Sequence, residues 1–320
     1  MGYYVGRIIE TPTGETPTGE TPTGETPTGE VDTPQMRYEA PESLEGAVAL
    51  LASAKDARVL AGGTDLLVQM RADVLDPELI VDIKKIPETR AVTEEKGGWR
   101  IGAAVTGAEL KEHPRLKKVW PGVVEAANLI GSTQVQGRAT MGGNLCNGSP
   151  AADSVPALIA AGAVATLAGP KGKRDLPVED VMLGPRKLAL EKGEIVASFF
   201  LPPQPARSSD AYLRFIPRTE MDIAVVGAGV SLTVDGAGIV TAARVSLGAV
   251  AARVLLVAEA AQAIVGSRLD AAAQERLEAA ARAACRPIDD KRGTVEFRIQ
   301  VAGVLARRAA LIALDRARSN

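Results

Sequence analysis

The chain has 320 residues, more than one small hydrophobic core can organise, so we expect two or three packed subdomains. Lysine and arginine total 37 and aspartate and glutamate 39, which excludes the broad positive field that nucleic acid or an anionic membrane requires. The single histidine, His113, argues against a Ser–His–Asp triad, a histidine zinc site and a haem site. We interpret it as a surface residue at a helix end.

The two cysteines, Cys146 and Cys285, are too few for a four-thiolate iron–sulfur site and form no CxxC pair. Unpaired cysteines favour a reducing compartment, so we expect a cytoplasmic protein. The most apolar run, residues 157–168, is shorter than the roughly 18–20 residues that cross a bilayer. We therefore expect no membrane span.

The first 35 residues have a composition of their own. Residues 11–30 repeat the unit Thr-Pro-Thr-Gly-Glu in tandem. Proline interrupts regular helix, and such a composition cannot bury a core. We predict that residues 1–35 form a disordered extension.

Regular patterns begin after Met36. Apolar residues at helical spacing, with Ser43 as N-cap, predict a helix over 43–54. The polar stretch 87–98 predicts a turn, and the small residues of 131–150 predict a long loop. The other strands expected in this half are 58–60, 79–83, 99–102, 163–167 and 195–201. The other helices expected in this half are 106–112, 119–130 and 151–161.

A stretch rich in proline and serine, residues 202–210, marks a boundary in the chain. Strands followed by helices in separate blocks predict an α+β C-terminal domain. We expect domains at 36–205 and 206–320, with a hairpin turn at Asp235-Gly236. The strands expected beyond the boundary are 212–216, 224–234 and 239–247. The helices expected there are 254–264, 271–285 and 295–316.

Two glycine-rich segments are candidates for ligand binding. In residues 59–66, Val-Leu-Ala-Gly-Gly-Thr-Asp-Leu, a strand ends in a glycine pair whose amides can face a pyrophosphate. Neither the Rossmann fingerprint nor a Walker phosphate loop is present, so a different fold must hold any nucleotide. Residues 137–153 crowd turn formers that can wrap a large ligand. There Asp153 has two interpretations, dipole capping of the next helix or acceptance from ligand hydroxyls.

The order of five motifs resembles a known family. Ala61-Gly62-Gly63-Thr64-Asp65, then Thr140-Met141-Gly142-Gly143-Asn144, then residues 149–153, 212–224 and 292–298 are similar to the FAD-binding medium subunit of the xanthine dehydrogenase and carbon monoxide dehydrogenase family, the molybdenum hydroxylases. The likeness extends from Met36 to the C-terminus. It implies an α+β fold: a two-lobed FAD-binding domain of the vanillyl-alcohol-oxidase/PCMH type and a smaller C-terminal domain.

The resemblance also implies a flavin site. It places Tyr212 close to the isoalloxazine ring and Arg214 where many relatives carry lysine beside the flavin; for Asp222 it leaves open whether the carboxylate fixes the fold or touches flavin. Cys146 lies beside the site and has either a redox role or, as we predict, a buried packing role. The residues expected to bind FAD are Ala61, Gly62, Gly63, Thr64, Asp65, Leu66, Thr140, Met141, Gly142, Gly143, Asn144, Asp153, Leu190, Tyr212 and Arg214.

The function implied is electron transfer, with the FAD lying extended between the lobes and the C-terminal domain. A small partner subunit with 2Fe-2S clusters would pass electrons from a large molybdenum-cofactor subunit to FAD and on to an external acceptor, in a dimer of heterotrimers. We expect no catalytic acid or base and no metal ligand in this chain. The alternatives are a stand-alone FAD-dependent oxidoreductase of related fold and a flavin-free scaffold subunit.

Overall fold

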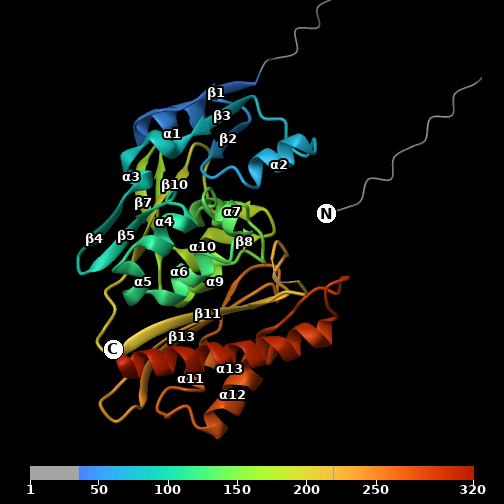
Figure 1. Cartoon of the computed structure of the whole chain (residues 1–320). Coiled ribbons are helices and arrows are strands. Elements are labelled where there is room, and N and C mark those ends of the chain that lie inside the picture. Colours follow the sequence, from blue (N-terminus) through green and yellow to red (C-terminus); the bar gives the residue numbers. More distant parts are fainter. Residues whose placement is uncertain (1–35, 219) are drawn as a thin grey trace, which may run out of the picture. The chain divides into compact units, whose positions relative to one another are not determined.

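The computed structural model describes residues 36–218 and 220–320 (Figure 1). The extension predicted over residues 1–35 lies outside the described residues. Within the described ranges the strands form sheets of three, five, four and two strands, and helices cover them.

The bounds of the elements are as follows. The strands are β1 (Arg37–Glu39), β2 (Ala57–Leu60), β3 (Leu79–Asp82), β4 (Val92–Glu95), β5 (Gly98–Gly102), β6 (Val164–Gly169), β7 (Gly172–Pro177), β8 (Met182–Gly184), β9 (Lys187–Leu188), β10 (Ile195–Leu201), β11 (Ser208–Phe215), β12 (Val226–Val234), β13 (Val240–Gly248) and β14 (Leu255–Leu256). The helices are α1 (Leu44–Ser53), α2 (Leu66–Arg71), the 3-10 helix η1 (Ile83–Lys85), α3 (Pro87–Arg90), α4 (Gly107–Glu112), α5 (Leu116–Val119), α6 (Pro121–Ala127), α7 (Thr133–Gln136), α8 (Met141–Cys146), α9 (Ser154–Ala160), α10 (Val178–Val181), α11 (Ala258–Gln262), α12 (Ala271–Ala284) and α13 (Val295–Ser319).

The first sheet is small and parallel. Its strands pair in the order β1-β3-β2, and all four residues of β3 are buried. Helix α1 begins at Ser43, whose hydroxyl accepts a hydrogen bond from the Gly46 amide. Its buried face carries Leu44, Ala47 and Leu51, which pack in one core with β3. This lobe positions the end of β2, where the first glycine pair follows.

The second sheet is antiparallel, in the order β4-β5-β10-β6-β7. The two faces of the sheet serve different cores, and a β-bulge between Val196 and Ser198 shifts the alternation within β10. Ile101 and Phe199 belong to the core on one face, whereas Ala168, Ile195 and Ala197 pack with α1 on the other. The sheet is therefore the shared wall between the first lobe and the helical layer beyond it.

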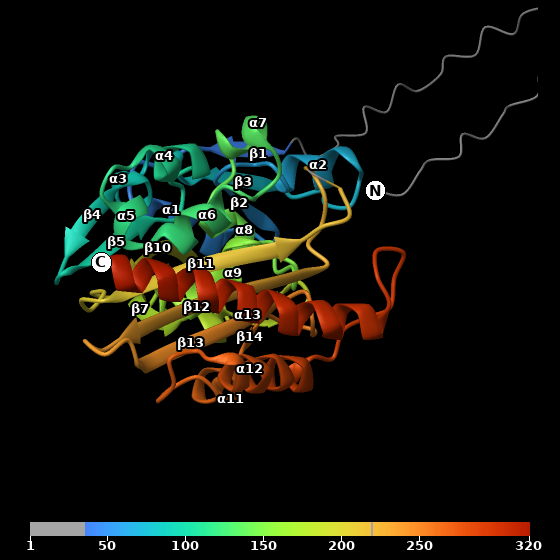
Figure 2. The ribbon, with the colours of Figure 1, turned by 60° about the horizontal axis from the view of Figure 1, so that its bottom comes forward.

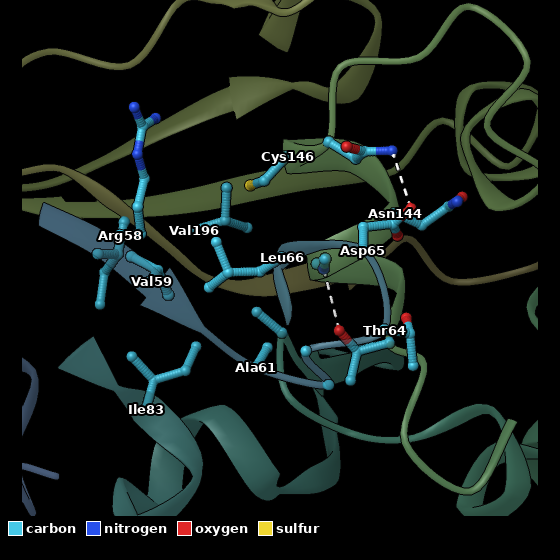
Figure 3. Close-up of a pocket in the computed structure, with 18 of the residues that line it drawn as sticks. Arg58, Val59, Ala61, Thr64, Asp65, Leu66, Ile83, Asn144, Cys146 and Val196 are labelled. Atoms are coloured by element: carbon cyan, nitrogen blue, oxygen red, sulfur yellow. Dashed lines mark hydrogen bonds between the residues drawn. The ribbon is translucent and has the colours of Figure 1, made fainter. Parts of the chain in front are cut away.

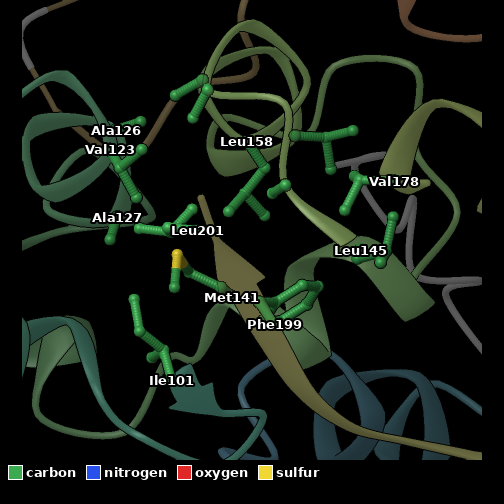
Figure 4. Packing of buried hydrophobic residues seen from close by; sticks show 14 of the residues in the cluster. Ile101, Val123, Ala126, Ala127, Met141, Leu145, Leu158, Val178, Phe199 and Leu201 are labelled. Atoms are coloured by element: carbon green, nitrogen blue, oxygen red, sulfur yellow. The ribbon is translucent and has the colours of Figure 1, made fainter. Parts of the chain in front are cut away.

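Helices α4–α6, α8 and α9 contribute to the core of this second lobe (Figure 4). Figure 4 shows Phe199 and Leu201 of β10 among side chains such as Val123 of α6 and Leu158 of α9. Helix α4 begins at a capping box between Thr106 and Glu109. Because α8 and α9 are tied into this core, the second glycine segment has a rigid support.

The C-terminal part is a four-stranded antiparallel meander, β11-β12-β13-β14, packed between two helical layers. Figure 2 shows α13 lying along β11 and β12, and both are in contact with it. The other face of the sheet contacts α6 and α9 of the preceding part of the chain. The carboxylate of Asp210 accepts hydrogen bonds of 2.9 Å from the amides of Gly122 and Val123, which ties β11 to the start of α6.

The expected fold class, a two-lobed α+β FAD domain with a smaller antiparallel C-terminal domain, is confirmed. Several local predictions were wrong. Residues 87–98 form α3 and β4 instead of a turn, and 131–150 contain α7 and α8. The helix predicted over 254–264 is shorter than expected. Its first residues form strand β14, which pairs with β13, and only α11 is helical. Short elements of this kind are stabilised by packing and carry little periodic signal.

Candidate functional site

The two glycine-rich segments border one cavity of about 340 Å³ (Figure 3). The first connects β2 to α2, and the second runs from Thr140 into α8. They are in contact, because Arg138 Nε donates to the Gly62 carbonyl at 3.3 Å. A Cβ at Gly62 would lie 2.1 Å from the Arg138 carbonyl oxygen, so only glycine permits this approach of two backbones. Segments 76 residues apart thus meet at one place.

The turn after β2 presents backbone donors without partners. Gly63 has a φ of +78°, in the left-handed region that favours glycine. The amides of residues 62–66 donate to no acceptor in the described part of the chain. Figure 3 shows Thr64, Asp65 and Leu66 of this turn around the cavity. Unpaired N–H groups gathered in one turn suit the oxygens of a bound diphosphate.

The second segment is a short helix instead of the loop expected from its composition. The Thr140 hydroxyl caps it by accepting from the Gly143 amide at 3.0 Å. A Cβ at Gly142 would lie 2.5 Å from the Ala103 carbonyl oxygen, so this glycine lets α8 pack on its neighbour. A Cβ at Gly143 would meet only the Thr140 hydroxyl, at 3.1 Å. Gly143 therefore keeps the cavity side of the helix bare.

The structure separates the expected FAD-binding residues into two groups. Met141 is buried in the hydrophobic core and does not line the cavity. Asp153, Tyr212 and Arg214 do not line the cavity either. Those that line it are Ala61, Gly62, Gly63, Thr64, Asp65, Leu66, Thr140, Gly142, Gly143, Asn144 and Leu190.

The second group forms a buried polar cluster between α9 and β11. The Tyr212 hydroxyl donates to Asp153 Oδ1 at 3.2 Å, and Arg214 Nη1 donates to Asp153 Oδ2 at 2.8 Å. Burial raises the pKa of Asp153 to about 6, while the Arg214 charge acts in the opposite direction. Asn144 links the cluster to the cavity, since its Oδ1 accepts from both the amide and the hydroxyl of Ser154.

Five charged or polar residues of the cavity were missed by sequence reasoning: Arg58, Gln69, Asn147, Arg186 and Glu194. Arg58 is 3.1 Å from Asp56 and partly exposed, and Arg186 follows β8, with its amide donating to Gly148. The Glu194 carboxylate is neutralised by Arg174, which holds its pKa below the usual range. A cation two residues before the end of β2 was visible in the sequence, whereas Arg186 and Glu194 come near the cavity only through the fold.

Cys146 corrects an expectation. It was predicted to be a buried packing thiol, but it is exposed and lines the cavity, where Figure 3 shows it near Val196. Its exposed surface opens onto the cavity, whose walls desolvate the thiol and raise its pKa to about 12. The thiolate is scarce at neutral pH, so the group is a poor nucleophile in this state.

Two other residues have structural partners. Asp222 Oδ2 and Oδ1 pair with Arg218 and Arg292 at 3.1 and 3.3 Å, and the Arg218 guanidinium lowers the pKa of the carboxyl. This favours the fold-fixing interpretation of Asp222. His113 ends α4, where its Nδ1 accepts from the Leu116 amide and its ring meets the edge of Trp99.

Two family models match the chain. The model of the FAD-binding domain in molybdopterin dehydrogenase matches residues 34–204, and that of the CO dehydrogenase flavoprotein C-terminal domain matches residues 211–313. The chain belongs to the FAD-binding medium subunits of the molybdenum hydroxylases. It thus carries the FAD-binding domain of that family. The glycine motifs that suggested the resemblance both lie within the first matched range.

Several members of the family are similar to this chain over nearly their full length. The carbon monoxide dehydrogenase medium chain of Afipia carboxidovorans is 35% identical over 88% of this chain and 98% of its own. The putative xanthine dehydrogenase FAD-binding subunit of Escherichia coli is 31% identical over 85% and 93%. A crystal structure of the Cu,Mo-CO dehydrogenase matches with a TM-score of 0.84 at 35% identity, covering 88% and 98%. Quinoline 2-oxidoreductase from Pseudomonas putida gives 0.80 at 28% identity, with the same coverage.

Within residues 36–218 and 220–320, no helix combines the length and apolar character that crossing a bilayer needs. Over the same ranges, no group of three or more His, Cys, Asp or Glu side chains could hold a metal ion.

Proposed function

We propose that this medium subunit holds FAD in the cavity and acts as an electron-transfer subunit, receiving electrons from a partner's iron–sulfur clusters and delivering them to an external acceptor. The observation that carries the proposal is the meeting of the two glycine segments around unpaired amides. The free amides of residues 62–66 suit a negatively charged group of a ligand, because such a group accepts several N–H donors at once. The diphosphate of FAD is a group of this kind. Once bound, the flavin supplies the redox chemistry.

The cavity residues divide the work of binding. The amides of residues 62–66 donate to phosphate oxygens, and Gly143 lets the ligand approach α8 closely. Arg186 offsets part of the diphosphate charge, since Arg58 is already paired with Asp56 and Glu194 with Arg174. Thr64 and Thr140 line the same space with hydroxyl groups.

We further propose that the Asp153 cluster lies toward the flavin ring and fixes its surroundings. Arg214 is almost wholly buried, and its charge is offset by Asp153 at 2.8 Å. A buried cation held in place by a carboxylate favours an anionic reduced flavin without needing to move. Leu190 lines the cavity and contributes an apolar contact surface.

The titratable side chains of the cavity favour the subunit role over a stand-alone oxidoreductase. Two are arginines, Glu194 is paired, and the Cys146 thiol has a pKa near 12. Among the carboxyl groups that line the cavity, only that of Asp65 has a raised pKa, and it accepts a hydrogen bond from Asn147. An enzyme that transforms an organic substrate here would need a free acid or base.

The relatives supply the proposed setting. By likeness to a medium chain of carbon monoxide dehydrogenase, we infer a large molybdenum-cofactor subunit and a small 2Fe-2S subunit as partners, assembled as a dimer of heterotrimers. The two free cysteines suit a reducing, cytoplasmic location. The organic substrate belongs to the large subunit.

The test has two arms. Gly143→Val places a branched side chain in the cavity, so the folded variant should lose the flavin absorbance that the wild-type chain gains with FAD. Normal FAD content in a folded Gly143→Val chain would contradict the site. In the second arm, a tagged chain purified from its native host should bring an iron–sulfur and a molybdenum subunit with it. Recovery of the chain alone would contradict the assembly.

A further inference from the structure

Helix α2 carries the first glycine turn into the site, yet it is poorly anchored by apolar packing. None of its residues is buried, and Leu67 and Val68 are 42% and 62% exposed. A six-residue helix is too short to be stable on propensity alone. Other contacts must therefore fix the position of the turn relative to α8.

One side chain makes those contacts from the far side of the cavity. Asn147, directly after α8, donates from Nδ2 to Asp65 Oδ1 at 3.3 Å and accepts at Oδ1 from Gln69 Nε2 at 3.1 Å. Asp65 and Gln69 are one helical turn apart, on the same face of α2. The amide of Asn147 thus bonds two successive turns of α2 with its one donor group and its one acceptor.

We propose that Asn147 is a positioning residue that holds the two glycine segments at the spacing that FAD binding requires. The proposal rests on the FAD site described above and adds the device that fixes its width. All three residues line the cavity, so a change in their bonding alters the wall that the ligand meets. The contact of Gly62 with Arg138 holds the near end of the turn, and Asn147 holds the far end.

The chemistry of the pair explains why an asparagine is required. Leucine of similar size would leave Asp65 and Gln69 without partners. Aspartate would keep the acceptor for Gln69 but set a second carboxylate against Asp65, and two adjacent carboxylates resist joint ionisation. Exchanging the two residues, with asparagine at 65 and aspartate at 147, restores one donor facing one carboxylate.

Full-length chains carrying Asn147→Leu, Asn147→Asp and the exchange Asp65→Asn/Asn147→Asp are titrated with FAD at pH 6 and pH 8, by flavin fluorescence. Asn147→Leu should bind FAD about tenfold more weakly at both pH values, because it removes two partly exposed hydrogen bonds that together contribute roughly 1–1.5 kcal/mol. Asn147→Asp should be about tenfold weaker at pH 8 and recover toward wild type at pH 6. The exchange should bind within about threefold of wild type at both. Gln300→Glu, which adds the same negative charge as Asn147→Asp at an exposed position outside the cavity, is the control.

The pH effect has one source among the groups that face Asp65. The other titratable groups lining the cavity are Arg58, Cys146, Arg186 and Glu194. Between pH 6 and 8 Glu194 stays ionised, because Arg174 lowers its pKa, and the Cys146 thiol stays protonated, because burial raises its pKa to about 12. Burial already raises the pKa of Asp65, so in the Asn147→Asp chain the carboxylate pair is the part of the cavity wall whose protonation responds to pH.

An exchange variant that binds no better than Asn147→Asp, or single variants that bind like wild type, overturns the positioning role. Melting temperatures of the FAD-free chains should stay close to wild type, since a merely structural role would lower them; a fall that tracks the loss of affinity overturns it too. Gly143→Val is titrated alongside. If it binds FAD normally, the proposed site is wrong and Asn147 falls with it; if it alone loses FAD, only the positioning role fails.

Discussion

Gly142 and Gly143 are neighbours in α8, yet the same substitution should have opposite effects at the two positions. Gly143→Ala should leave the FAD-free chain at least as stable as wild type and weaken FAD binding. Gly142→Ala should destabilise the fold. The difference follows from what a Cβ would meet: the Ala103 carbonyl oxygen at 2.5 Å for Gly142, but only the Thr140 hydroxyl at 3.1 Å for Gly143.

The magnitudes can be worked from these contacts. Alanine in place of glycine favours a helix by about 0.5–1 kcal/mol, a gain that Gly143→Ala keeps except for a slight crowding of Thr140. Its methyl group stands where a phosphate oxygen would approach, so the loss of one charge-assisted hydrogen bond, about 1.5–3 kcal/mol, weakens FAD binding roughly 10- to 150-fold. At Gly142 the methyl group overlaps backbone atoms, and overpacking of this kind costs about 1–3 kcal/mol.

Two measurements on each variant separate stability from affinity. Urea unfolding of the FAD-free chain, followed by circular dichroism, gives the free energy of unfolding. Titration with FAD, followed by flavin fluorescence, gives the dissociation constant. The reasoning would be refuted by a Gly143→Ala chain that binds FAD as tightly as wild type, or by a Gly142→Ala chain that unfolds at the wild-type urea concentration.

Three further predictions concern other parts of the chain. Burial raises the pKa of Asp210 to about 7, so the folded chain holds a proton that the unfolded chain releases, and the free energy of unfolding should fall as pH rises from about 4 to about 7; an Asp210→Asn chain with the same slope in urea unfolding would contradict this. A chain lacking residues 1–34 should bind FAD with wild-type affinity, and a weaker dissociation constant would show that the head takes part. Bound FAD should slow maleimide labelling of Cys146, with Cys146→Ala as the unlabelled control because Cys285 is buried; equal rates with and without FAD would place the ligand elsewhere.

The glycine motifs could be recognised in the sequence because tight turns and close backbone contacts require glycine, which has few other uses in regular structure. Gly62 and Gly63 follow a strand, and Thr140 and Gly142 open a crowded turn region. Composition alone indicated loops there, and the family resemblance added that both segments serve one ligand. That they touch through Gly62 and Arg138 is a property of the fold, invisible at a separation of 76 residues.

The missed features share a physical cause. Helix α8 is six residues long and glycine-rich, so its stability comes from packing on Ala103 and not from propensity. Cys146 was expected in a core because cysteine is usually buried, but the α8 surface that carries it faces the cavity. The pairing of Asp153 with Arg214 was also not visible in the sequence, because it depends on how β11 crosses α9. Tertiary contacts decided each of these cases.

Strand β11 carries two sets of side chains toward two different neighbours. Asp210, Tyr212 and Arg214 face the flavin domain, whereas the alternate residues, such as Ala211 and Leu213, face the core beneath α13. An insertion or deletion of a single residue in this strand would turn charged groups into that core and aliphatic ones toward Asp153. Length changes should therefore be tolerated in the hairpin at Asp235 and not in β11. Engineering that fuses a reporter or linker into this subunit should use the hairpin.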